Sequence, residues 1–324
     1  MKGENDMKKI KIMVCTTAFM LLASAAFGTT FVTIGSGGVG GTYYPLGGVM
    51  AELLTKGNVD IKATSRSTAA SKENCRLVGS NKAQVGMTMG STLYQAYTGT
   101  EAFKDDGRLP LLTLMHMYAA PQHLVTTSRT GIKEFADIKG KKISLGAQGG
   151  GDQLLSLMIL EAAGMDPDKD IRKQQLSQPE AVTALKDGNI DAAFFNFAVP
   201  GSAVMEIAAV RDVVLIALPD DLIAKVTGKH PFLMPYTIAK GAYSKQDKDI
   251  KTVADGNFLV VNEKLPEKAA YDMVKIFIEK KEEIMKVTPQ AAEFTPQKSG
   301  VGIIPFHSGS ARYFRENGVT VDTK

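Results

Sequence analysis

Apolar runs and amphipathic segments alternate along the first part of the chain. Residues 31–34 form a short apolar, β-branched run that predicts a strand. Residues 44–56 repeat their apolar positions at helical spacing, which predicts a helix with one apolar face. A strand over 60–65, a helix over 71–79 and a strand over 84–89 follow. Strands and helices in this order are typical of an α/β sheet.

A second unit with the same order of elements follows. Two short apolar runs, 124–127 and 142–145, predict strands, and the segment 153–163 predicts a helix. A helix over 179–187 and a buried strand over 190–195 complete the unit. We therefore expect two similar α/β lobes.

A glycine-rich turn links a predicted strand to a predicted helix in both units. The first turn, 35–42, leads into the helix over 44–56. The second, 146–151, leads into the helix over 153–163, for which Asp152 is a suitable N-cap. Such turns expose backbone N–H groups at helix N-termini, and these groups bind anions. One turn in each unit predicts a single anion-binding cleft between the two units.

The N-terminus has the three parts of a secretory signal peptide. Residues 7–11 are basic, residues 12–22 are apolar and residues 23–28 are mostly small. We expect cleavage after Ala26 or Gly28. The apolar run is shorter than the about 20 residues that cross a bilayer. The pattern predicts an exported, periplasmic protein, with an uncleaved N-terminal anchor as the alternative.

Composition and motifs exclude several classes of function. Cys15 leaves with the signal peptide, so Cys75 has no partner for an intramolecular disulfide. A net charge of +4, without Trp, is too weak for a nucleic-acid footprint. The chain lacks the G-x-S-x-G and S-x-x-K patterns of serine nucleophiles. Its four histidines lack the spacing of metal ligands, so we expect neither a metal site nor an enzyme.

The first glycine-rich turn also matches the dinucleotide-binding pattern G-x-G-x-x-G over residues 35–40. Asp60 lies near the distance at which that pattern places a ribose-binding acid. However, Asp60 begins its predicted strand, whereas a ribose-binding acid ends one. Nicotinamide cofactors are also scarce outside the cytoplasm. We therefore favour a carboxylate ligand over a dinucleotide and expect no cofactor.

Polar side chains gather where the second predicted strand ends, over residues 64–68. Ligands of open α/β sheets bind beyond the carboxyl ends of the strands. Arg66 is the candidate clamp for a carboxylate, with a surface ion pair as the alternative. Asn74 is a candidate amide donor, with a solvent-facing position as the alternative. Tyr43 and Tyr44 are candidate walls of the cleft, and we expect one of them to pack in the core.

Five segments, in order along the chain, carry a resemblance to a known family. They are GSGGVGGTYYPLGG at 35–48, TAASKEN at 68–74, GIKEFADIKGKK at 131–142, DGNIDA at 187–192 and IPFHSGSARYF at 304–314. The chain resembles the TAXI family (TRAP-associated extracytoplasmic immunogenic proteins). These are solute receptors of tripartite ATP-independent periplasmic (TRAP) transporters.

The resemblance implies an α/β periplasmic binding protein fold, type II-like, with a ligand cleft between two lobes and hinge strands. We expect a signal peptide at 1–28 and the first part of lobe I at 29–123. Lobe II is then expected at 124–235. Residues 236–324 are expected to return to lobe I and to include C-terminal helices, one of them at 267–280.

The resemblance also implies a function. The receptor would capture a small carboxylate, glutamate or 2-oxoglutarate-like, and deliver it to a TRAP permease driven by an ion gradient. We expect it to act as a monomer and to bind no nucleic acid. The alternatives are an exported enzyme and an immunogenic surface protein that use the same cleft.

The motifs and the two turns give the candidate ligand-binding residues. Lobe I supplies one end of the site, the turn before Gln153 supplies N–H groups, and the segment after the strand at 190–195 closes the far wall. The candidates are Gly41, Thr42, Tyr43, Arg66, Ser67, Thr68, Asn74, Met89, Ser91, Gln148, Gly149, Gly150, Gly151, Asp152, Gln153, Asn196, Phe197 and Pro200.

This chain departs from the family pattern at some of these positions. Relatives often have G-S-G-T where this chain has residues 149–152. Asp152 would repel a carboxylate if it faced the ligand, but not if it only capped its helix. Met89 and Ser91 stand where a Gln and an Asp are frequent, and the loss of an acid favours an anionic ligand. Residues 196–200 also differ from the usual Gly-Pro ending. Because of these departures, the sequence specifies the ligand less closely than it specifies the family.

Overall fold

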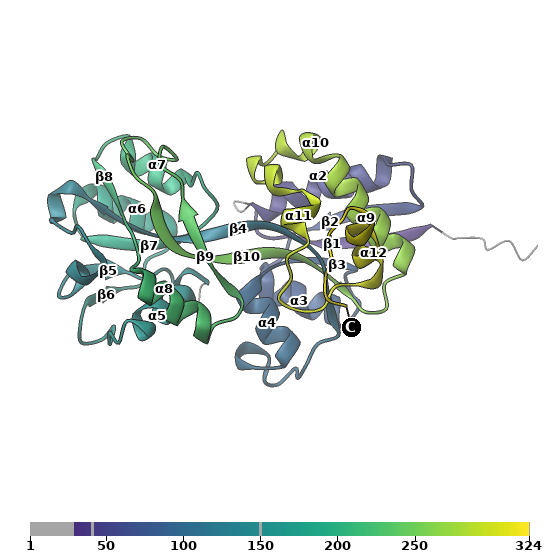
Figure 1. Ribbon diagram of the computed structural model, residues 1–324, viewed down its shortest axis with the longest axis horizontal. Coiled ribbons are helices and arrows are strands. Elements are labelled where there is room, and N and C mark those ends of the chain that lie inside the picture. Colours follow the sequence, from purple (N-terminus) through teal and green to yellow (C-terminus); the bar gives the residue numbers. More distant parts are fainter. Residues whose placement is uncertain (1–28, 40–41, 149–150, 324) are drawn as a thin grey trace, which may run out of the picture.

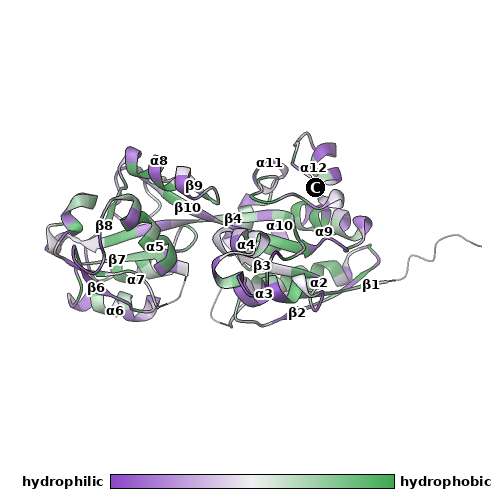
Figure 2. Cartoon of the chain, turned by 90° about the horizontal axis from the view of Figure 1, so that it is seen from below, coloured by the Kyte–Doolittle hydropathy of each residue, from purple (hydrophilic) through white to green (hydrophobic). Residues whose placement is uncertain are grey.

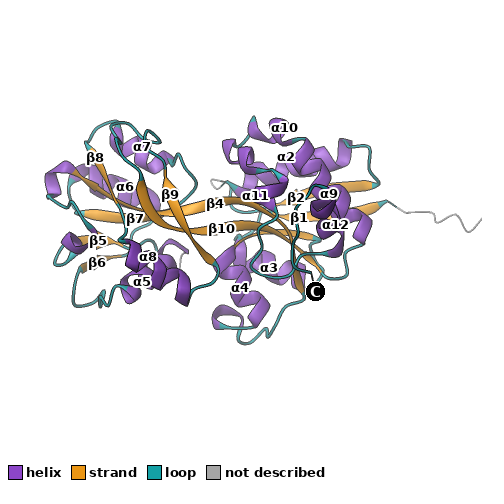
Figure 3. Ribbon diagram, viewed as in Figure 1, coloured by secondary structure: helices purple, strands orange, loops and turns teal. Residues whose placement is uncertain are grey.

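Two α/β lobes, joined by two long strands, make up the computed structural model of this protein (Figure 1). The structure describes residues 29–39, 42–148 and 151–323. Each lobe has a central sheet with helices on both faces (Figure 3). The expected two-lobed α/β fold is confirmed.

Lobe I has a mixed sheet. Strands β1 (Thr30–Gly35), β2 (Ile61–Arg66) and β3 (Val85–Met89) are parallel to one another. The sheet continues through β10 (Ile250–Asn262), which is antiparallel to β3, and β4 (Leu111–Thr127). The strand order is β2-β1-β3-β10-β4.

Helices cover both faces of this sheet. Helices α2 (Tyr43–Lys56), α9 (Glu267–Glu279) and α12 (Ser308–Glu316) share one apolar core with it. Helices α3 (Ser71–Gly79) and α4 (Gly90–Thr98) share the other. The shorter helical segments are η1 (Glu101–Phe103), α10 (Lys281–Met285), η4 (Pro289–Glu293) and α11 (Pro296–Ser299).

Lobe II is built around the other halves of the two long strands. Strands β5 (Lys142–Ser144), β6 (Arg172–Gln174) and β7 (Ala192–Asn196) extend the sheet from β4. Strand β8 (Val213–Ile216) also pairs with β4, and β9 (Leu233–Ile238) pairs with β10.

The helices of lobe II also lie in two layers. Helices α5 (Gly151–Ala162) and α8 (Asp220–Lys229) pack on one face. Helices α6 (Gln178–Asp187) and α7 (Ser202–Ala208) pack on the other. Two 3₁₀ turns, η2 (Ser128–Thr130) and η3 (Phe135–Ile138), precede β5. Within the described parts of the chain, no helix has the length and apolar character that a bilayer crossing needs.

Hydrophobic periodicity located the amphipathic elements well. The helices expected over 71–79, 179–187 and 267–280 correspond to α3, α6 and α9 within one residue at each end. Their buried residues are mostly apolar, and Figure 2 shows hydrophobic and hydrophilic residues mixed along the helices of both lobes. These three predictions are confirmed, whereas α8 and α12, which also have one buried face, were not predicted.

The two long strands differ from the sequence prediction. Only 124–127 of β4 was expected, and β10 was not located. Every one of the 17 residues of β4 is buried. A strand buried on both faces shows no alternation of apolar and polar positions, so its sequence lacks the usual period of two.

The boundaries between the lobes also lie inside these strands. The expected boundary at residue 123 falls within β4. The expected return to lobe I at residue 236 comes later along the chain, because Ile238, Tyr243 and Ile250 still pack in a core of lobe II. The chain therefore re-enters lobe I along β10.

The pairing of β4 with β10 is irregular where it passes between the lobes. The register shifts between Asn257 and Phe258, and again between Leu259 and Val260. A bulge of this kind bends the strand and changes the direction of nearby side chains. On the lobe II side of the first shift, Asn257 lies opposite Tyr118.

Candidate functional site

A cleft of about 540 Å³ lies between the lobes. Both lobes and both long strands contribute to its lining. The lining residues are Gly37, Gly38, Thr42, Tyr43, Ala70, Ser71, Met89, Tyr118, Ala120, Gln178, Asn196, Phe197, Ala198, Pro200, Gly201, Ser202, Asn257 and Gln290.

Lobe I presents the start of two helices to the cleft. Thr42 and Tyr43 begin α2, and Ala70 and Ser71 begin α3. Neither helix has a side-chain hydrogen bond from its N-cap residue. Unpaired N–H groups and the positive end of the helix dipole make such a terminus favourable for an anion.

Hydroxyl and amide groups form the floor of the cleft. The Tyr43 hydroxyl donates a hydrogen bond to Asn257 Oδ1 at 2.5 Å. Asn257 Nδ2 donates to the Tyr118 carbonyl at 3.4 Å, and the hydroxyls of Thr42 and Tyr118 interact. Burial raises the pKa of Tyr43 well above its usual value and also raises the pKa of Tyr118. Both phenols therefore stay neutral, and they can donate as well as accept hydrogen bonds.

The segment after β7 forms the wall on the lobe II side. Asn196 Nδ2 donates to the Ala120 carbonyl at 2.7 Å, which attaches this wall to β4. The Phe197 ring packs on His123, with 4.5 Å between ring centroids. Pro200 completes the apolar part of the wall.

A buried chain of hydrogen bonds fixes this wall from behind. His123 Nδ1 lies 2.9 Å from the Pro121 carbonyl, so Nδ1 carries the proton and Nε2 accepts. The Tyr243 hydroxyl, 2.8 Å away, donates to Nε2 and accepts from the Gly201 N–H at 2.8 Å. Burial lowers the pKa of His123 to about 4, which keeps the ring neutral. The start of α7 is thereby tied to a strand that crosses both lobes.

Asn74 supports the site from within lobe I. Its amide nitrogen donates to the carbonyls of Ser36 and Met87, both at 2.7 Å, and its oxygen accepts from Thr68 at 2.8 Å. Asn74 is fully buried, so the expected solvent-facing alternative is wrong. Ser67 donates to the Gly37 carbonyl at 2.9 Å. These three side chains hold the first glycine-rich turn and do not line the cleft.

Arg66 does not line the cleft either. Its guanidinium lies 3.7 Å from the Glu73 carboxylate, and its side chain is 54% exposed. Glu73 also accepts a hydrogen bond from the Ala69 N–H at 2.7 Å. The structure therefore favours the surface ion pair over the expected carboxylate clamp.

Ser91 is a partner of a buried acid. Its N–H lies 3.2 Å from both carboxylate oxygens of Asp255, on β10. Asp255 also accepts from the backbone of Gly90 and Gly256, and burial raises its pKa to about 7. Asp255 sits at the start of α4 and outside the cleft lining, so Ser91 is a structural residue here.

The second glycine-rich turn is described only in part, since Gly149 and Gly150 lie outside the described residues, as does Gly41 of the first turn. Asp152 lies inside α5, which begins at Gly151, so the expected N-cap role is wrong. Its carboxylate accepts from the Gln178 amide at 3.1 Å and from the Asn196 backbone.

The remaining candidates of that turn lie off the cleft lining. Gln148 is exposed and Gln153 is buried in α5. Gly151 lies close to Met89 of lobe I, because a Cβ built on it would be 3.0 Å from the Met89 sulfur. The two lobes therefore approach each other at this point.

Six of the expected residues line the cleft: Thr42, Tyr43, Met89, Asn196, Phe197 and Pro200. The other twelve lining residues were not among the candidates. Ser71, Gln178 and Ser202 lie at helix starts, where a search for helix N-termini would find them. Tyr118, Ala120 and Asn257 come from the irregular strand pair, and Gln290 comes from η4, for which the sequence carries no comparable signal.

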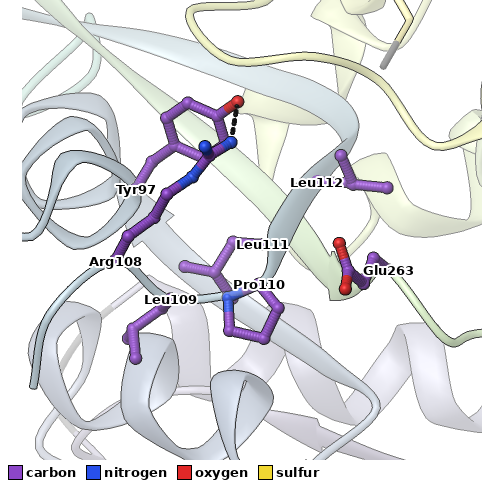
Figure 4. A pocket seen from close by; sticks show the side chains of 7 residues that line it. All are labelled: Tyr97, Arg108, Leu109, Pro110, Leu111, Leu112 and Glu263. Atoms are coloured by element: carbon purple, nitrogen blue, oxygen red, sulfur yellow. Dashed lines mark hydrogen bonds between the residues drawn. The ribbon is translucent and has the colours of Figure 1, made fainter.

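A smaller pocket of about 250 Å³ lies within lobe I (Figure 4). Its cation, Arg108, lies over the Tyr97 ring at 4.3 Å and donates to the Tyr97 hydroxyl at 2.6 Å. This pocket draws on one lobe only. The cleft between the lobes is therefore the candidate site.

Comparison with known proteins identifies the fold and the family. The sequence matches the model of the NMT1-like family over residues 34–318. The periplasmic aliphatic sulphonate binding protein SsuA of Escherichia coli is similar in structure, with a TM-score of 0.51, 16% identity and coverage of 89% of this chain and 90% of that chain. A periplasmic sulfonate-binding protein SsuA from Methylobacillus flagellatus KT is also similar, with a TM-score of 0.50 and 17% identity. That match covers 87% of this chain and 76% of the other. At these identities the likeness shows a shared fold.

We predict that Tyr243→Phe destabilises the protein by about 1–3 kcal/mol, because Gly201 N–H and His123 Nε2 both lose a buried partner. Urea unfolding of the ligand-free protein measures this. Tyr44→Phe is the control, since Tyr44 is 41% exposed and its variant is expected to stay within about 0.5 kcal/mol of the parent. Equal stability of the two variants would contradict the role of the Tyr243 hydroxyl.

We predict that Asp255→Asn changes the pH dependence of stability. The folded pKa of Asp255, about 7, is above the usual value, so its protonated form favours folding and this contribution is lost as pH rises towards and past 7. The Asn variant does not titrate at this position, so its stability does not fall in this way as pH rises. Relative to the parent, its free energy of unfolding should therefore increase between pH 5 and pH 8, by about 2 kcal/mol.

Urea unfolding at the two pH values measures the difference, and Asp247→Asn on the surface removes the same charge as a control. His116 and His123, whose pKa values burial lowers to about 4, contribute equally in all three proteins. Parallel pH profiles for the parent and Asp255→Asn would show that this carboxyl titrates normally.

Proposed function

Because the chain belongs to the NMT1-like family and has the two-lobed fold of periplasmic solute-binding proteins, we propose that it is a solute receptor. It binds a small organic anion in the cleft and delivers it to a membrane permease. The observation that carries this proposal is the cleft between the lobes, onto which the starts of α2 and α3 open.

The chemistry of the cleft supports binding over catalysis. Its described lining holds hydroxyl, amide and apolar side chains, but no His, Cys, Asp, Glu or Lys. A Ser or Thr nucleophile needs an adjacent general base, and no described lining residue supplies a His, Asp, Glu or Lys side chain for that role. Hydroxyls, amides and N–H groups suffice to orient a bound solute.

The connection between the lobes supports a closing motion. The strands β4 and β10 carry the chain between the lobes, and small backbone changes in them can rotate one lobe against the other, as in hinge closure around a ligand. The paired positions Ala119 and Gly256 carry minimal side chains, and Ala120 faces the cleft itself. Closure would bring the Phe197 wall over a solute held at the start of α2.

The finer proposal is a TAXI-type receptor of a TRAP transporter, with a carboxylate such as glutamate or 2-oxoglutarate as its solute. Two of the motifs behind the resemblance support it. The segment 35–48 supplies Gly37, Gly38, Thr42 and Tyr43 to the cleft, and the segment 68–74 supplies Asn74, which supports them. We further propose export to the periplasm through the signal peptide at 1–28, which lies outside the described residues.

A sulfonate is the second candidate solute. The Escherichia coli protein of similar fold is described as an aliphatic sulphonate binding protein, and the Methylobacillus flagellatus protein is described as the periplasmic sulfonate-binding protein of a sulfonate ABC transporter. Sulfonates and carboxylates can both accept hydrogen bonds from the N–H groups of a helix N-terminus, because both are anions with several acceptor oxygens.

We predict that small carboxylates or sulfonates raise the melting temperature of the protein. A ligand at a hundredfold excess over its dissociation constant stabilises the folded state by about 2.7 kcal/mol. For a chain of this size that corresponds to several degrees. A thermal-shift screen, together with mass spectrometry of co-purified solute, measures this. If sugars or cationic solutes stabilise the protein and no organic anion does, the proposed anion receptor is wrong.

A matched pair of variants localises the solute. A Cβ on Gly38 or on Gly48 meets no atom within 4 Å, so both positions accept a side chain. Gly38 lines the cleft, whereas Gly48 lies on α2 away from it. Gly38→Asp should raise the dissociation constant of the anion at least about tenfold through like-charge repulsion, and Gly48→Asp should not. Arg66→Ala is expected to leave the affinity unchanged.

The permease type has its own test. Uptake of the identified solute into proteoliposomes that hold the partner permease should depend on an ion gradient and not on ATP. The parent receptor and its cleft variant Gly38→Asp are compared with the same proteoliposomes. When the solute concentration is limiting, the uptake rate should be lower with the variant. Uptake that requires ATP and does not depend on the ion gradient would contradict the TRAP proposal and indicate an ABC-type permease.

A further inference from the structure

The cleft lining contains no charged side chain among the described residues, and the inference drawn from this rests on the proposed receptor function. The four residues of the two turns that lie outside the described part are Gly40, Gly41, Gly149 and Gly150, and glycine adds no charge. The polar lining consists of the hydroxyls of Thr42, Tyr43, Ser71, Tyr118 and Ser202, and the amides of Gln178, Asn196, Asn257 and Gln290.

The acids near the cleft already have partners. The Asp255 carboxylate is 1% exposed and accepts from the Ser91 N–H and from two further backbone N–H groups. The Asp152 carboxylate accepts from Gln178 and from the Asn196 backbone. Neither residue lines the cleft.

Two further acids lie on the lobe I side and are also engaged. Glu73 faces Arg66 and accepts from the Ala69 N–H at 2.7 Å. Glu293, at the end of η4, accepts a hydrogen bond from the Ala119 backbone. The described lining therefore places no carboxylate against a solute in the cleft.

This arrangement treats the two ends of an amino acid differently. Its carboxylate can accept hydrogen bonds from N–H groups and hydroxyls and lies at the favourable end of the helix dipoles of α2 and α3. Its ammonium group would lose water beside the same positive helix ends. A buried cation without a paired acid is strongly unfavourable.

We propose that the cleft selects organic anions that carry no ammonium group. A 2-oxo or 2-hydroxy acid, or a simple sulfonate, is preferred over the amino acid or aminosulfonate of the same skeleton. Among the carboxylates considered above, 2-oxoglutarate fits this lining and glutamate does not.

Two pairs of compounds test the proposal on the unmodified protein. 2-Oxoglutarate and glutamate differ in one substituent, as do ethanesulfonate and 2-aminoethanesulfonate. Isothermal titration calorimetry should show at least about tenfold tighter binding of the ammonium-free member in any pair that binds. Equal or tighter binding of the ammonium-bearing member overturns the inference and leaves the receptor function intact. If no organic anion binds, the receptor function itself fails.

A variant that adds an acid to the lining tests the cause. Asn257→Asp keeps the acceptor for the Tyr43 hydroxyl and places a negative charge on the floor of the cleft. It should weaken binding of the ammonium-free anion at least about tenfold and reduce its preference over the ammonium-bearing partner.

Asn262→Asp is the matched control, because it adds the same buried charge to the same strand away from the cleft, where Asn262 bonds the Val78 carbonyl. The control should retain the preference of the parent. An unchanged preference in Asn257→Asp overturns the claim that the charge of the lining sets selectivity. If that variant does not fold, the two pairs of compounds decide the question on the parent protein.

Discussion

Backbone hydrogen bonds between β4 and β10 hold the two lobes together, and most features of the site depend on this pairing. The two strands run antiparallel through both sheets, so each lobe is completed by segments that also belong to the other. The register shift beside Asn257 lies where the strands leave lobe I. It places Asn257 and Tyr118 side by side on the floor of the cleft. In the proposed receptor, the same irregular pair connects the lobes, allows them to close and forms part of the binding surface.

The described lining of the cleft offers a solute only neutral groups. Burial keeps the Tyr43 and Tyr118 phenols protonated, and the nearby acids are engaged by backbone N–H groups. The resulting surface favours negative charge through dipoles and not through a cation. A site of this kind gains little from long-range attraction. It depends instead on the exact position of its N–H groups, which explains why Asn74 and the His123–Tyr243–Gly201 chain brace the lining from behind.

The sequence predicts the fold better than the site. The helices at α3, α6 and α9 were located because each has one buried and one solvated face. The long strands were not, because burial on both faces removes the period of two. For the same reason Tyr118 and Asn257 could not be assigned to the site. Arg66 and Asn74 were expected at the solute because their types suit a carboxylate. Contacts with Glu73 and with the Ser36 carbonyl, which no spacing reveals, give them other roles.

The insertion of lobe II between β4 and β10 also determines how the chain can fold. The lobe I sheet has the order β2-β1-β3-β10-β4, so β3 lacks its neighbour on one side until β10 has emerged. The core of that sheet also needs α9 and α12, which come later still. Contacts between segments so distant in sequence form slowly. The N-terminal strands of an emerging chain are therefore unable to complete their core early. Under the proposed export through a signal peptide, this delay would keep the chain in a form that a translocation channel accepts.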